Sequence, residues 1–134
     1  MNALSLLQVQ QGLYGKLSGD GVLMGMIHAL YDQVPERAQF PYAIIGDGAF
    51  TPLRTHVPLA GNCSMRIRVY SQKPGRKEVL RILDRIYGLL HLGTLTLVES
   101  MTLSLHVTQA SSQLLSDQRT IEGVLTVNCL VTEG

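Results

Sequence analysis

SMRIRVYSQKPGRKEVLRILDRIYGLL, residues 64–90, changes its apolar spacing half-way along. Apolar and polar side chains alternate over residues 64–70, which predicts a strand with one buried side and one solvent-facing side. From residue 79 onward the apolar side chains recur every three or four positions, which predicts an amphipathic helix. We expect Pro74 in its first turn and Gly93 just beyond its end. The apolar stripe of this helix is predicted to comprise Val79, Ile82, Leu83, Ile86 and Leu90, with Tyr87 beside it.

Further strands are predicted on both sides of this segment. Alternation or short apolar runs, bounded by turn residues, mark residues 27–32, 42–46, 51–57, 94–98, 101–108 and 121–132. Gly46-Asp47-Gly48 is interpreted as a turn that ends the strand at 42–46, and Ser116-Asp117-Gln118 as a turn before the last strand. Prolines 35, 41, 52 and 58 are expected at strand starts, edges or loops, because proline cannot donate to a strand ladder.

The N-terminal segment has helical spacing, followed by a short helical turn at 22–26. Its apolar side is predicted to comprise Ala3, Leu6, Leu7, Gln10, Leu13, Tyr14 and Leu17. Strands occur in runs rather than alternating with helices. The predicted fold class is therefore α+β, an antiparallel β-sheet with an N-terminal helix and a central amphipathic helix packed on one face. The 134 residues contain no linker or repeat, so we expect residues 1–134 to form a single domain.

The composition excludes several classes of protein. Apolar residues make up 46% of the chain and charged residues 16%, with a net charge of +1, which is typical of a globular domain rather than a disordered chain. No run of 18 apolar residues indicates a membrane span, and the first residues lack the basic start of a signal peptide. Cys63 and Cys129 are expected to be free, buried thiols, and their spacing leaves a disulfide open.

No residue pattern is typical of catalysis or metal binding. The four histidines have no metal-ligand spacing, and neither cysteine has a second cysteine nearby. A triad of Ser71, His106 and Asp47 can be written on paper, but any chain of this length supplies such a set. We therefore expect no catalytic residue, no metal site, no cofactor and no enzymatic activity. The histidines are expected to be isolated; they are His28, His56, His91 and His106.

Residues 66–85 concentrate positive charge. Seven cations stand against two carboxylates there, a net charge of +5, whereas residues 86–134 carry −3. Two interpretations stay open: a solvated face, or a surface complementary to an acidic partner or to DNA. The candidate interaction residues are Arg66, Arg68, Lys73, Arg76, Lys77, Arg81 and Arg85. Four of these, at positions 66, 68, 81 and 85, lie off the apolar faces and are expected to be solvent-exposed.

A set of short motifs resembles the small tail-completion proteins of long-tailed phages and gene transfer agents, also called tail terminators or tail-to-head joining proteins. The resemblance is carried by Tyr31-Asp32-Gln33-Val34-Pro35, Ala38, Phe40-Pro41-Tyr42 and Ile45-Gly46-Asp47, then by Ser71, Gly75 and Glu78, and late in the chain by Asp117, Arg119, Thr120 and Gly123. Its structural motif residues are Pro35, Phe40, Pro41, Tyr42, Gly46 and Asp47. None of these residues has a catalytic role in the pattern.

The resemblance implies a virion structural protein, made in the bacterial host cytoplasm and located at the head–tail junction. Copies of the chain are expected to form a ring, by the resemblance a hexamer, that caps the tail tube, stops its growth and joins the tail to the head connector. The implied partners are the chain itself, the tail tube protein and the head–tail connector protein. DNA is expected to pass through the ring without sequence-specific binding, and no membrane is involved. The alternatives are a head-side stopper, a minor tail protein, a nucleic-acid-binding adaptor or a small hydrolase or transferase.

Overall fold

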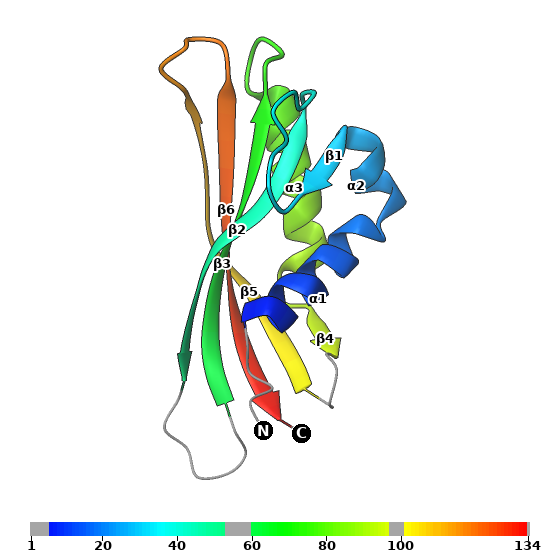
Figure 1. The fold of residues 1–134 in the computed structure, drawn as a ribbon, viewed down its shortest axis with the longest axis vertical. Helices are drawn as coiled ribbons and strands as arrows, with labels where there is room; N and C mark the ends of the chain where they lie inside the picture. Colours follow the sequence, from blue (N-terminus) through cyan, green and yellow to red (C-terminus); the bar gives the residue numbers. More distant parts are fainter. Residues whose placement is uncertain (1–5, 53–59, 97–100, 134) are drawn as a thin grey trace.

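The centre of the fold is one six-stranded sheet (Figure 1). The computed structural model describes residues 6–52, 60–96 and 101–133. The strands are β1 (Ala29–Tyr31), β2 (Tyr42–Pro52), β3 (Ala60–Ser71), β4 (Thr94–Thr96), β5 (Met101–Leu114) and β6 (Ile121–Glu133), in the order β1-β2-β3-β6-β5-β4. Neighbouring strands are antiparallel except β1 and β2, which run parallel because the chain returns through residues 32–41 before it starts β2.

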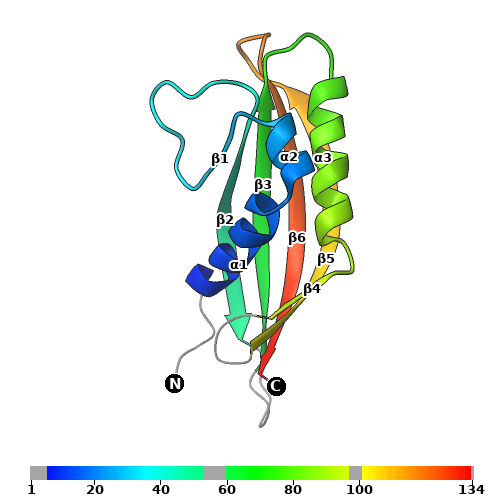
Figure 2. The same ribbon diagram turned by 90° about the vertical axis from the view of Figure 1, so that its right-hand side faces the viewer.

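Three helices cover one face of the sheet, as Figure 2 shows from the side. They are α1 (Leu6–Ser18), α2 (Gly21–Met26) and α3 (Lys77–Leu90). The predicted α+β fold with helices on one face is confirmed, with the correction that the pair at the β1 edge is parallel. No helix in the described part of the chain is long and apolar enough to cross a membrane. A single domain over residues 1–134 stays a prediction.

The core lies between the three helices and the covered face of the sheet. Every second residue of β3 and β6 is buried, and β3 buries Met65, Ile67 and Val69, as the alternation predicts. Cys63 and Cys129 are opposite one another in the β3–β6 ladder, and both are free and buried. The predicted free thiols are therefore confirmed. Burial raises the pKa of the Cys63 thiol to about 11 and that of Cys129 to about 12.

The stripe predicted for α3 is confirmed, since its five predicted residues are the buried residues of the helix. The predicted start is wrong. The helix begins at Lys77, and Pro74 lies before it in an exposed loop, because Gly75 adopts a φ of 90° that no helix residue has. At the other end, Gly93 N–H donates to the Leu90 carbonyl (3.1 Å), which agrees with the predicted stop.

The predicted orientation of α1 is wrong in part. Val9, Leu13 and Leu17 face the core, whereas Leu6, Leu7 and Tyr14 are exposed. Leucines occur around much of this helix, so three- and four-residue spacing alone allows more than one buried face. Ala3, the first residue of the predicted apolar side, lies outside the described residues.

Gly46-Asp47-Gly48 does not end a strand. Instead β2 continues through it as a β-bulge, and the register with β3 shifts between Gly46 and Ala49. Asp47 has a φ of 55°, and the backbone inserts one extra residue into β2 here rather than reversing direction. The strand predicted at 51–57 overlaps only the end of β2, and residues 53–59 lie outside the described residues.

Candidate interaction surfaces

The seven candidate interaction cations fall into three groups in the structure. Lys73, Arg76, Lys77 and Arg81 form the first group, which we call the basic cluster, and they are exposed around the start of α3. Their side chains make no ion pair or hydrogen bond with the described residues. A helix N-terminus disfavours cations because its free N–H groups are already positive. The cluster therefore offers unneutralised positive charge to the surroundings.

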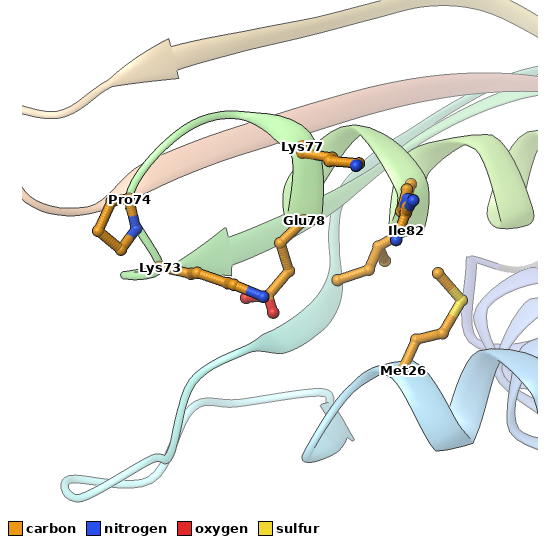
Figure 3. A pocket seen from close by; sticks show the side chains of 7 residues that line it. Met26, Lys73, Pro74, Lys77, Glu78 and Ile82 are labelled. Atoms are coloured by element: carbon orange, nitrogen blue, oxygen red, sulfur yellow. The ribbon is translucent and has the colours of Figure 1, made fainter.

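A pocket of about 300 Å³ lies beside the basic cluster, between α2 and the start of α3. Figure 3 shows Met26 of α2 and Ile82 of α3 pointing toward one another, with Lys73 and Glu78 at the rim. Its walls are apolar and its rim is mostly cationic. Such a lining suits a partner that presents an acidic group next to an apolar side chain.

The strand-to-helix junction holds the basic cluster in place. Ser71 is fully buried, and its hydroxyl donates to Glu78 Oε1 (2.6 Å) and accepts from the backbone N–H of Lys73 (3.1 Å). Gly75 makes the turn at positive φ between these contacts. Ser71, Gly75 and Glu78 thus act together to connect β3 to α3, and Glu78 is engaged there rather than neutralising a lysine.

Arg85 forms the second group, and its charge is used inside the fold. Its guanidinium donates to both oxygens of Asp20, with Nη2 to Oδ1 at 2.6 Å and Nε to Oδ2 at 2.9 Å. Asp20 also accepts from the backbone N–H of Leu23 (2.8 Å) and so caps the start of α2. The Arg85 hydrogen bond, followed by the Leu23 bond, lowers the pKa of Asp20 below its ordinary value. This pair connects α2 to α3.

Arg66 and Arg68 form the third group, on the sheet face that the helices leave uncovered. Arg66 is exposed, as expected. Arg68 is half-buried and pairs with Asp47 of the β2 bulge and, more distantly, with Glu122 of β6 (3.8 Å). The expected exposure is therefore right for Arg66 and Arg81 and wrong for Arg68 and Arg85, because tertiary contacts bring carboxylates to the latter two.

The Phe40-Pro41-Tyr42 motif builds an aromatic cluster on the same face. Tyr42 contacts Phe40, Tyr31 of β1 and Tyr70 of β3, with ring centroids 5.2, 5.6 and 5.3 Å apart respectively. The hydroxyl of Tyr70 donates to Glu122 (2.7 Å). The Phe40–Pro41 peptide bond, directly before β2, is cis. The motif thus fixes the β1–β2 edge of the sheet to its centre.

Asp117 organises the turn between β5 and β6. Its carboxylate accepts from the backbone N–H groups of Arg119 and Thr120 and from the Thr120 hydroxyl (2.9, 2.8 and 2.6 Å). These bonds, led by the Thr120 hydroxyl, lower the pKa of Asp117 to about 2. The turn predicted at 116–118 is confirmed, with Gln118 at a φ of 61°.

No group of three metal-ligating side chains occurs within residues 6–52, 60–96 and 101–133. The histidines are less isolated than expected. The ring of His91 stacks on Tyr87 (4.6 Å) and lies 5.1 Å from His106, and its Nδ1 accepts from the backbone N–H of Val107 (3.1 Å). Because Nδ1 of His91 accepts from the backbone of β5, the His91–His106 pair is a structural contact between the end of α3 and β5. His56 lies outside the described residues.

The model of a protein family described as tail completion protein gp17 matches residues 11–132. The chain belongs to this family. It is therefore a tail completion protein. The motifs by which the sequence resembles this family form three structural features. These are the Ser71–Gly75–Glu78 junction, the aromatic cluster around Tyr42 and the turn organised by Asp117.

Two solved structures share the fold of this tail completion protein. A chain from the virion of a native gene transfer agent particle has a TM-score of 0.86 at 18% identity, with 98% of this chain and 99% of that chain covered. The gp17 protein of bacteriophage SPP1 has a TM-score of 0.60 at 20% identity, covering 96% and 94%. No curated protein sequence matches the chain. At these identities the likeness concerns the fold alone.

Proposed function

We propose that the protein caps the tail tube as a ring of its own copies, stops tube growth and joins the tail to the head connector at the head–tail junction. Membership of the tail completion family carries this proposal. The structure supports a role in assembly because the described surface offers sheet edges, an uncovered sheet face and an unneutralised basic cluster. We also propose that the protein has no catalytic turnover, that the ring is a hexamer, and that DNA passes through it without sequence-specific contacts.

The basic cluster is proposed as the contact to an acidic partner. Lys73, Arg76, Lys77 and Arg81 are four neighbouring cations without an ion pair among the described residues, and the Ser71–Glu78 hydrogen bond fixes the loop that leads into this start of α3. Charge complementarity of this kind speeds encounter and selects the correct partner surface. We expect the partner to be the tail tube protein or the head–tail connector protein.

Electron microscopy of particles assembled without the protein tests the proposed function. A tail terminator predicts tubes longer than those of the wild type, and purified protein added to assembled tubes should bind at one end. Full heads that lose DNA while tails keep their normal length would indicate a head-side stopper instead. Binding along the whole tube would indicate a minor tail protein.

A nucleic-acid-binding adaptor is tested separately by titrating the protein with duplex DNA at several salt concentrations. Neutralised phosphates would give an affinity that falls steeply as salt rises. We expect no binding at physiological salt, because the four cations of the basic cluster are few and the described surface has no stacking platform of exposed aromatic rings on that side.

A further inference from the structure

One edge of the sheet is open over half of its length. β4 pairs with β5 only at residues 102–104, and a few further bonds from residues 91–93 reach Leu105 and Val107. Beyond that point residues 109–114 pair with β6 on one side and have no strand on the other among the described residues. Their outward backbone groups can therefore pair with another chain.

This edge lacks the devices that usually protect an edge strand. Residues 101–116 contain no Asp, Glu, Lys, Arg or Pro, and such residues are what natural sheets use to prevent edge-to-edge contacts. The bulge in β5 falls between Val107 and Gln109, before the open part begins. The unprotected length of edge is consistent with a surface that is covered in the assembled particle.

A groove runs beside the open edge, between α3 and β5. We call it the α3–β5 groove. It has a volume of about 290 Å³ and is lined by Leu80, Leu83, Asp84, Tyr87, Ala110 and Ser112. Leu80 and Tyr87 are 44% and 45% exposed, so apolar surface faces solvent there. Asp84 is the one charged residue of the groove, and it has no ion pair with the described residues.

The loop of residues 32–41 lies at the opposite edge of the sheet. It connects β1 to β2 and projects on the side away from α3 and β5 (Figure 2). Pro35 and Pro41 keep the backbone near them extended. Glu36 and Arg37 are adjacent, exposed and without an ion pair in the described part of the chain. The loop has ten residues, which is longer than the median connection of about 4–6 residues, and it exposes both of these charges at its projecting end.

We propose that the α3–β5 groove of one copy receives the 32–41 loop of a second copy, with Arg37 of the loop paired to Asp84 of the groove. The loop and the groove are at opposite edges of one sheet, so the contact is heterologous. Repetition of such a contact gives a ring when the rotation from one copy to the next closes, as the proposed function requires. This inference rests on the proposed ring function and adds the residues at the boundary between copies.

Charge reversal tests the pairing. Arg37→Asp and Asp84→Arg should each weaken self-assembly, measured by sedimentation over a range of concentrations and by binding to tube ends, by about tenfold or more. The double variant should recover to within about threefold of the wild type. Arg119→Asp, the same charge change at the exposed β5–β6 turn, is the matched control and should have no effect. Unaltered assembly in both single variants, or a double variant no better than the singles, overturns the proposal.

A cross-linking experiment tests the same contact without relying on tube capping. Arg37→Cys and Asp84→Cys are made in separate chains and mixed under mild oxidation, since the native thiols are buried. A cross-link that forms only in the mixture supports the contact. If Asp84→Arg fails to fold, Asp84→Asn takes its place in the assembly assay of the charge-reversal experiment. The proposed contact is overturned if each variant alone cross-links as well as the mixture. It is also overturned if the mixture forms no cross-link under conditions where the protein assembles, either in solution by sedimentation or on capped tubes. If the protein assembles and cross-links but does not stop tubes, the proposed function fails and this contact stands.

Discussion

Gly123→Ala should destabilise the protein, because α3 packs directly on this residue of β6. A Cβ atom added at Gly123 would lie 2.5 Å from Cγ1 of Val79 and 2.9 Å from Cδ1 of Leu83. Overpacking of a closed core costs about 1–3 kcal/mol. Alanine in a strand regains about 0.5–1 kcal/mol relative to glycine. Taking the middle of each range, the net loss in the free energy of unfolding is about 1 kcal/mol, or a fall of roughly 3–5 °C in melting temperature.

The assay is urea denaturation followed by far-UV circular dichroism, with Gly88→Ala as the matched control. Gly88 lies in α3 itself, and a Cβ atom there meets no heavy atom within 4 Å. Because alanine favours a helix over glycine, Gly88→Ala should stabilise the protein by about 0.5–1 kcal/mol. Gly123→Ala should thus lower the free energy of unfolding, whereas Gly88→Ala should raise it.

The double variant Val79→Ala with Gly123→Ala separates close packing from other causes. Removing Cγ1 of Val79 makes room for the new methyl group, so the double variant should lose less stability than the sum of the two single losses. A Gly123→Ala protein as stable as the wild type, or strictly additive losses in the double variant, would refute the reasoning that α3 rests on the bare backbone of Gly123.

Three further outcomes are expected. Cys63 and Cys129 should not react with a thiol reagent at pH 8 until the protein unfolds, because burial raises their pKa values to about 11 and about 12; rapid reaction of the native protein would contradict this. Arg85→Gln should lower the melting temperature at pH 7. Because the Arg85 pair lowers the pKa of folded Asp20, the pair stabilises the protein at pH values above 3.8, the ordinary pKa of Asp, and this stabilisation is lost as the pH falls below that value. The melting temperatures of the wild type and Arg85→Gln should therefore converge in acid. A difference in melting temperature that is independent of pH would contradict the pair. Arg68→Glu should destabilise by about 1 kcal/mol or more because it sets three carboxylates side by side, and unchanged denaturant midpoints would show that the outer-face pairs contribute nothing.

Local pattern was sufficient for the elements whose two faces differ strongly. In β3 and β6 a strict alternation matched a sheet covered on one side, and in α3 a single apolar stripe matched the buried face. The free, buried state of the two cysteines was also predicted correctly. The N-terminal helix was oriented incorrectly because its leucines do not define one face, and β2 was divided because Gly46-Asp47-Gly48 has the composition of a turn.

The amino-acid sequence by itself determined the α+β class, the central helix and strands, and the family to which the protein belongs, because periodicity and short motifs are properties of neighbouring residues. Tertiary structure alone decided which charges are free. Arg85 and Asp20 are 65 positions apart in the chain. Arg68 of β3 pairs with Asp47 of β2 and with Glu122 of β6, which lie on the two neighbouring strands. The two candidate contact surfaces likewise exist only after folding, since the open edge of β5 and the loop at 32–41 acquire their places from the order of strands in the sheet. Strand order depends on contacts between residues that are far apart in the chain, and the spacing of neighbouring residues does not indicate which of these contacts form.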